Sequence, residues 1–260
     1  MFMVKREALN GPIVEEHGLS IETICKIYEL AEQLLRTAIG PKRIETLTEG
    51  DFGIKSDINL IEIADWLGIT VYTDVISSEA YCMMRDEILE KEKEKGEIPY
   101  INQYDKKEID YIAEVEIRKC LSKECQSGSR ATIRVSNLFT TTTQNFAIAC
   151  GIAKIYFADS NLFERMLPQK FYVLSDWVYD TKNSMIEKMF AYALVAPHSF
   201  MCKLEEKYRQ TQSKYPIDLS DWLDTLSNAI NIPEMHAIYA WKCWKQYRYL
   251  KYSNRDNEVN

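Results

Sequence analysis

The longest apolar run in this chain extends from Phe146 to Ala158 and is interrupted by a single charge, at Lys154. The run is too short to span a bilayer as a helix, which takes about 20 residues. Apolar side chains lie almost all round the helix axis between Thr142 and Ala158, so we predict a helix that passes through the core. The threonines at 140–143 supply its N-terminal cap.

The overall composition is that of a globular protein. The chain has 260 residues, with 46% apolar and 27% charged residues, which allows one large domain or two smaller ones. Nine glycines are few for this length and argue against a glycine-rich, all-β architecture. The net charge of −7 argues against broad, charge-driven binding of nucleic acid, although it leaves room for a local basic patch.

Two further features indicate a cytoplasmic protein without a membrane partner. Residues 1–7 contain charges and lack the apolar core of a signal peptide. The seven cysteines are scattered and odd in number, which is typical of reduced thiols rather than of a disulfide framework.

Helical spacing of apolar residues predicts a first helix from Ile21 to Ala38, capped by Ser20 and stopped at Gly40. Residues 42–56 are mostly polar, and we predict a linker there. Asp57 is a candidate cap for a short helix, 57–67.

Gly68 follows this short helix, in the position where a helix ends with a positive φ. Residues 69–73 alternate as a strand, and this helix–glycine–strand unit indicates an α+β protein. The alternating charges of 84–96 predict a solvated helix, and 105–121 a second helix with its apolar residues inward. Residues 126–129 are predicted as a loop.

The second half of the chain is predicted to be mostly helical. Residues 131–135 alternate as a strand, and 171–174 are a short strand or a turn. The core helix is followed by four more predicted helices, at 184–195, 200–211, 218–230 and 234–251. Residues 253–260 are predicted to be disordered. The expected fold class is therefore α+β, mostly helical, with a small sheet.

Several segments, taken in order, resemble the ImmA/IrrE family of zinc metallopeptidases. They are Leu60 to Val71 with its Leu-Gly-Ile, Ile133 to Asn137 followed by Gln144 to Phe157, Phe190 to Pro197, and the turn Ile230 to Pro233. The family has a strand ending near an Asn, a helix with a His-Glu-x-x-His motif, and a later helix that carries the third zinc ligand. The resemblance implies a zincin-like core over roughly residues 57–244.

The resemblance also implies a division of the chain into regions. Residues 1–45 are an N-terminal helical segment that packs on the core or extends it. Residues 57–200 are the peptidase-like domain, with a helical insertion at about 83–126, and residues 201–252 are a C-terminal helical region.

The departures from the family pattern fall on the residues that carry the chemistry. Cys150 stands at the first ligand histidine, Gly151 at the glutamate base, Lys154 at the second histidine and Ile186 at the third ligand. Glu187 lies one residue further along, about 100° round the helix. A zinc peptidase needs two histidines and a glutamate here, so we expect no metal, no cofactor and no peptidase activity.

Two interpretations of Lys154 follow. The simpler is that its side chain extends to solvent from an apolar helix, with Cys150 as a small core residue. The sharper hypothesis is that its ammonium replaces the charge of the zinc ion and pairs with Glu187 or a nearby carboxylate, because a lysine in so apolar a helix needs a partner or an exit to water.

A cysteine nucleophile is an alternative at Cys150 and needs a histidine nearby. His198, after the helix that carries the third-ligand position, gives the one pair worth naming. We favour a structural cysteine and a surface histidine.

The segment from Trp241 to Tyr252 interleaves aromatic and cationic residues and contains no acid. The simpler interpretation is an amphipathic helix with its rings packed inward and its cations near the helix C-terminus. The alternative is a surface that stacks on bases or binds an acidic partner. Its candidate contact residues are Lys242, Lys245, Tyr247, Arg248, Tyr249 and Lys251.

The resemblance therefore leads us to expect a catalytically inactive protein that acts by binding a protein partner. The family implies a regulator associated with a phage, a mobile element or a stress response, and a partner such as a helix-turn-helix repressor. One alternative is a nucleic-acid-binding or defence-related protein that uses the C-terminal helix. The other is a residual hydrolase with a rebuilt site around Cys150.

Overall fold

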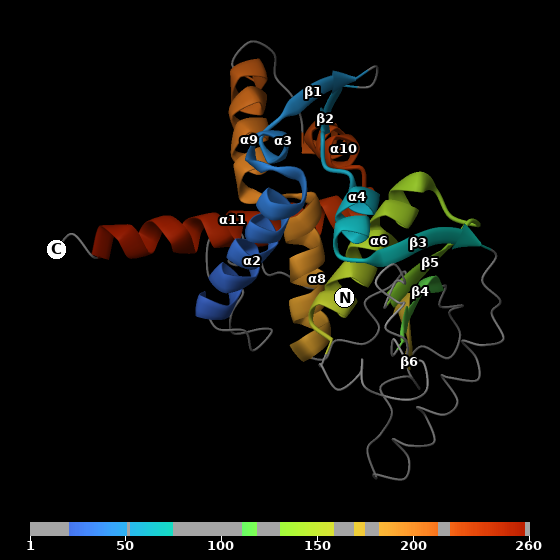
Figure 1. Ribbon diagram of the computed structural model, residues 1–260. Coiled ribbons are helices and arrows are strands. Elements are labelled where there is room, and N and C mark those ends of the chain that lie inside the picture. The colour runs from blue at the N-terminus through green and yellow to red at the C-terminus, as the bar shows by residue number, and fades with distance from the viewer. Residues whose placement is uncertain are drawn as a thin grey trace, which may run out of the picture.

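The computed structural model describes residues 21–50, 53–74, 111–118, 131–158, 169–174, 182–212 and 219–257. Within these ranges the protein is α+β and mostly helical (Figure 1). The elements in chain order are α2 (Ile21–Ile39), α3 (Pro41–Ile44), β1 (Leu47–Gly50), β2 (Gly53–Ser56), α4 (Leu60–Trp66), β3 (Ile69–Asp74), β4 (Tyr111–Ile117), β5 (Ala131–Ser136), α6 (Thr141–Tyr156), β6 (Gln169–Leu174), α8 (Lys182–Val195), α9 (His198–Gln212), α10 (Leu219–Ile230) and α11 (Glu234–Asn257).

The larger sheet has four strands in the order β3-β5-β4-β6, with β3 parallel to β5 and the other pairs antiparallel. Helix α6 packs against β4 and β5. Ile133 on β5 contacts α6, and its cross-strand partner Val115 on β4 shares that face of the sheet because paired residues point the same way.

The helical core is built around α8, which packs against α6, α2 and α11. Every residue from Met189 to Ala196 is buried, so the C-terminal half of α8 is apolar on all sides. Figure 1 shows α8 between α2 and α6, with α11 running across the bundle. The prediction of a buried core helix is confirmed for α6, in which residues 146–153 are all buried.

Most of the other predicted elements are also confirmed. Helices α2, α8, α9 and α10 and strands β3, β5 and β6 lie where the patterns predict them. Gly68 has a φ of 72°, a conformation that glycine adopts without a steric penalty. Thr140 caps α6 by accepting a hydrogen bond from the backbone N–H of Thr143. The predicted cap Ser20, helix 84–96 and loop 126–129 lie outside the described residues.

The prediction of a helix at 105–121 is wrong where the chain is described, because residues 111–117 form β4. The apolar residues there fit both periods, but Ala113 and Val115 alternate with Glu114 and Glu116 in the manner of a strand. Hydrogen-bonded pairing with β5 on one side and β6 on the other selects the strand rather than the helix. The described part of the expected helical insertion is thus a central strand of the sheet.

The prediction of a linker at 42–56 is also wrong. Pro41 starts the short helix α3, whose Ile44 is fully buried, and a hairpin of β1 and β2 follows. The hairpin packs through β2 against α10. A few apolar residues, here Ile44, Leu47 and Ile54, are enough to dock a largely polar segment on the core.

Two helix ends differ from prediction. Asn59, not Asp57, caps α4, and its side chain accepts hydrogen bonds from Ile61 N and Glu62 N. Asp57 instead binds Arg43, with 3.1 Å between the carboxylate and Nε. Helix α11 continues to Asn257, so the prediction of disorder is wrong for 253–257. None of the helices in the described ranges is long and apolar enough to cross a membrane.

Candidate functional site

The positions that the resemblance assigns to the zinc ligands lie where α6 packs against α8. Lys154 Nζ lies 3.0 Å from Glu187 Oε2, and the two side chains are 26% and 21% exposed. The ammonium also lies 5.7 Å from the centre of the Phe171 ring on β6. The Lys154–Glu187 contact that the sharper hypothesis expects is therefore present, while about a quarter of the Lys154 side chain still reaches solvent.

Cys150 lies one helical turn before Lys154 and is buried. Burial raises the pKa of its thiol to about 12, although the nearby cations Lys188 and Lys154 act to lower it. The sulfur is therefore a neutral thiol near neutral pH, and only the thiolate acts as a nucleophile or a metal ligand.

Gly151, which the resemblance places at the position of the glutamate base, touches the sheet directly. A Cβ atom added here would lie 2.8 Å from Cδ1 of Ile133 and 3.0 Å from both of its Cγ atoms. Ile133 is itself fully buried, so it has little freedom to move aside. In this packing, position 151 has no room for a carboxylate side chain.

Ile186, which the resemblance places at the position of the third ligand, is partly buried against the apolar core. Its neighbour Glu187 is the residue of α8 that reaches Lys154. The junction therefore brings together Cys150, Lys154 and Glu187, with one carboxylate, one ammonium and one buried thiol. Among the residues that the structure describes, no group of three or more His, Cys, Asp or Glu side chains is arranged to hold a metal ion.

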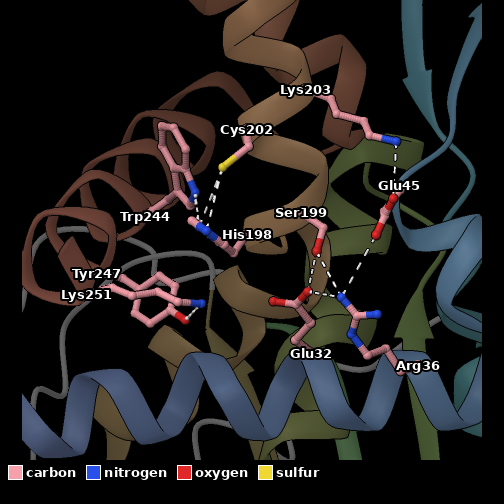
Figure 2. Close-up of polar contacts among 10 residues, drawn as sticks. All are labelled: Glu32, Arg36, Glu45, His198, Ser199, Cys202, Lys203, Trp244, Tyr247 and Lys251. Atoms are coloured by element: carbon pink, nitrogen blue, oxygen red, sulfur yellow. Dashed lines mark hydrogen bonds and ion pairs between the residues drawn. The ribbon is translucent and has the colours of Figure 1, made fainter. Parts of the chain in front are cut away.

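His198 does not pair with Cys150. It is buried rather than on the surface, and its Nδ1 accepts a hydrogen bond of 3.1 Å from Trp244 Nε1 (Figure 2). The proton of the neutral ring is therefore on Nε2, which lies 3.6 Å from the sulfur of Cys202. With Nδ1 occupied and Nε2 protonated, His198 cannot take a proton from either thiol.

The charge state of His198 follows from the same surroundings. Burial lowers its pKa to about 4, and the positive charges of Lys251 and Arg248 act in the same direction, while Glu32 opposes them. The ring is therefore neutral at neutral pH.

A polar cluster that the sequence patterns did not reveal links α2 with α9 and α3. Glu32 accepts hydrogen bonds from Ser199 and Arg36, and Arg36 also approaches Glu45, which pairs with Lys203 (Figure 2). Burial alone would raise the pKa of Glu32, but the bonds from Ser199 and Arg36 hold it below its ordinary value. The i,i+4 spacing of Glu32 and Arg36 is the one sequence signal for this cluster.

The candidate contact residues of α11 divide into two groups. Tyr247 is buried and stacks on Tyr28 of α2, with ring centres 4.5 Å apart and planes within 7°, so it cannot meet a partner. Lys251 donates a hydrogen bond of 2.9 Å to the Tyr247 hydroxyl. Tyr247 therefore joins α11 to α2, and Lys251 supports it from within α11.

The other four candidates lie nearer to solvent. Lys245 and Arg248 both pair with Glu205 of α9. Lys242 lies 5.7 Å from the centre of the Tyr239 ring, and Tyr249 is 54% exposed. The structure therefore supports part of the expected surface and removes Tyr247 from it.

Comparison with protein-family models, with curated proteins and with solved structures finds no match to this chain. The likeness to the ImmA/IrrE family therefore depends on the order and content of its motifs.

Proposed function

We propose that this chain is a non-catalytic binding protein with an ImmA/IrrE-like, zincin-like core, in which the former metal site has become a contact between two helices. The observation that carries the proposal is the Lys154–Glu187 ion pair. The pair puts the ammonium of Lys154 where the resemblance implies a zinc ion, and the carboxylate of Glu187 neutralises that ammonium.

The order of elements supports the assignment of positions. Helix α4, Gly68 and β3 are followed by β5, the core helix α6 and then α8, in the chain order that the resemblance implies. Helices α6 and α8 pack directly on each other, so residues one turn apart on α6 and a residue of α8 reach one place. This is the arrangement that a site with two ligands on one helix and one on another requires.

The proposed function is regulation through a protein partner. The partner class, a helix-turn-helix repressor or another regulator of a phage, mobile element or stress response, comes from the resemblance alone. A hydrolase built around Cys150 is less well supported, because burial keeps its thiol protonated and His198 is bonded to Trp244.

The assignment of positions can be tested by restoring ligands. We expect wild-type protein, expressed with added zinc, to hold less than one equivalent of metal by elemental mass spectrometry. The double variant Cys150→His, Lys154→His places two imidazoles one turn apart beside Glu187, and we expect it to take up zinc. Cys150→His alone is the matched control and should not.

Two results would contradict this proposal. One zinc per wild-type chain would mean that the ligands lie elsewhere. If the folded double variant did not bind zinc, the α6–α8 junction would not correspond to a metal site.

Partner binding at this junction can be tested through Tyr156. Its ring is 37% exposed and stacks on Phe190 of α8, with centres 4.7 Å apart, two residues beyond Lys154. We expect a partner captured by the wild-type protein from native lysate to be lost with Tyr156→Ala. Trp66→Ala, which removes an exposed ring on α4, should keep the partner. Equal capture by both variants would place the interface away from the junction.

A further inference from the structure

The outer face of α11 carries cations and exposed rings together. At about 100° per residue, Lys242, Lys245, Arg248, Tyr249 and Tyr252 fall within roughly 120° of the helix circumference. Tyr249 and Tyr252 are 54% and 45% exposed, and they lie one turn apart. The buried residues Tyr247 and Leu250 lie on other sides of the helix, while on the outer face Lys245 and Arg248 reach Glu205 of α9 and the Tyr252 ring lies 6.4 Å from that of His198.

The charge on this face is positive although the whole chain is acidic. Between Glu234 and Asp256 the sequence of α11 contains no carboxylate. Glu205 of α9 is one carboxylate facing three cations, Arg209, Lys245 and Arg248, so that cluster keeps an excess of positive charge. Both Lys245 and Arg248 remain about one-third exposed, at 31% and 32%.

The arrangement of α11 makes this face accessible. Figure 1 shows its C-terminal part extending outward past α2 and α9. Lys245 also lies over the rings of Trp241 and Trp244, at 4.6 and 5.2 Å from their centres, which fixes the side chain along the helix. The cations are thus held in place by internal contacts, while Tyr249 and Tyr252 each remain about half exposed.

We propose that this face of α11 binds single-stranded nucleic acid. Cations alone would fit any acidic partner, but the two exposed tyrosines add flat surfaces on which unpaired bases stack. A duplex hides the faces of its bases, and the carboxylate side chains of an acidic peptide have no ring to stack on the two tyrosines. Phosphates would lie over Lys242, Lys245 and Arg248, and bases on Tyr249 and Tyr252.

The contacts determine which variants give a clean test. Neutralising Lys245 or Arg248 would also remove a partner of the buried Glu205 carboxylate, which destabilises the protein for another reason. Lys242, Tyr249 and Tyr252 avoid that difficulty, because the ion pairs of Glu205 are those with Arg209, Lys245 and Arg248. The exposed ring of Trp66 on α4 is the matched control.

The experiment measures fluorescence anisotropy of a labelled oligothymidylate of about 20 nucleotides, a length that spans one such site. We expect binding by the full chain that weakens by about tenfold between roughly 50 and 200 mM KCl, because a few phosphate contacts release counterions. Tyr249→Ala with Tyr252→Ala should weaken binding at least about tenfold, whereas the double change to Phe should not. Lys242→Gln should reduce the log–log salt slope by about 0.7, and Trp66→Ala should change nothing.

Three results would overturn the proposal. One is the absence of salt-dependent binding by the wild-type protein. Another is unchanged affinity after both tyrosines are removed from a protein that remains folded by circular dichroism. The last is binding of a labelled polyglutamate with the same affinity as the oligothymidylate, when removal of the two tyrosine rings changes neither affinity. That result would assign the face to an acidic polypeptide.

Discussion

Lys154 on α6 and Glu187 on α8 form an ion pair of 3.0 Å across the interface of two helices that are otherwise apolar where they meet. Because both groups are about three-quarters withdrawn from water, we expect a coupling free energy of about 1 kcal/mol in a double-mutant cycle of Lys154→Met and Glu187→Gln. Each single variant should unfold at a lower urea concentration than the wild type.

The matched control for this cycle is Lys203 with Glu45, a pair at 3.2 Å whose side chains are 49% and 40% exposed. Solvent screening should reduce its coupling to roughly 0–0.5 kcal/mol. If the Lys154–Glu187 coupling were no larger than that of the control, the pair would not be a required contact.

Gly151→Ala should destabilise the protein even though alanine favours a helix. The helix preference is worth about 1 kcal/mol, but the added methyl group overlaps Ile133, and overpacking of this kind costs about 1–3 kcal/mol. Chemical denaturation measures the difference. The double variant with Ile133→Val should lose less than the sum of the two single losses, because valine lacks the closest atom. Strict additivity would show that the contact is not the cause.

Acid should weaken the joint between α9 and α11. His198 has a pKa of about 4 in the folded protein against an ordinary value of 6.5, so the folded state favours the neutral ring. The stabilisation is fully present above pH 6.5 and is lost as the pH falls from 6.5 towards 4. At about pH 5 the loss should be on the order of 1–2 kcal/mol.

The check is the free energy of unfolding at neutral pH and at about pH 5 for the wild type and His198→Gln, in which no ring titrates. The wild type should lose more stability than the variant over this interval. Equal losses would show that His198 is not responsible.

Gln246→Leu should stabilise the protein. Gln246 is 4% exposed, and neither its amide nitrogen nor its amide oxygen has a hydrogen-bond partner in the described part of the chain. Replacing an unpaired buried amide by an apolar group of similar size should gain about 1 kcal/mol. Gln144→Leu is the control and should destabilise, because the Gln144 amide donates to the carbonyls of Ser136 and Phe139. A loss of stability in both variants would contradict the prediction.

Helices and strands whose apolar residues follow one clear period could be predicted from the sequence. Helices α2, α6, α8 and α10 and strands β3 and β5 each follow a single pattern, and their ends are close to prediction. Strand β4 could not be predicted, because its apolar residues fit a helix as well, and only β5 and β6 on its two sides settle the choice. The hairpin at 47–56 was missed because Leu47 and Ile54 are too few to stand out among polar neighbours.

The candidate site was predictable to the same degree. The positions of Cys150, Gly151 and Lys154 on one helix follow from their spacing, and Glu187 was named as a partner from its distance along α8. The contact of Gly151 with Ile133 depends on how closely α6 approaches the sheet, which no local pattern encodes. The burial of His198 and Tyr247 depends in the same way on the crossing of α2, α9 and α11.

The close approach of α6 to the sheet also limits how this chain can change over generations. A carboxylate at position 151 needs a smaller residue at 133, yet shortening Ile133 first would leave a cavity that costs about 0.5–1.5 kcal/mol. Enlarging Gly151 first would create a clash. Each single step lowers stability, so the two changes would have to arise together. The packing of Gly151 against Ile133 therefore disfavours the acquisition of a carboxylate at position 151.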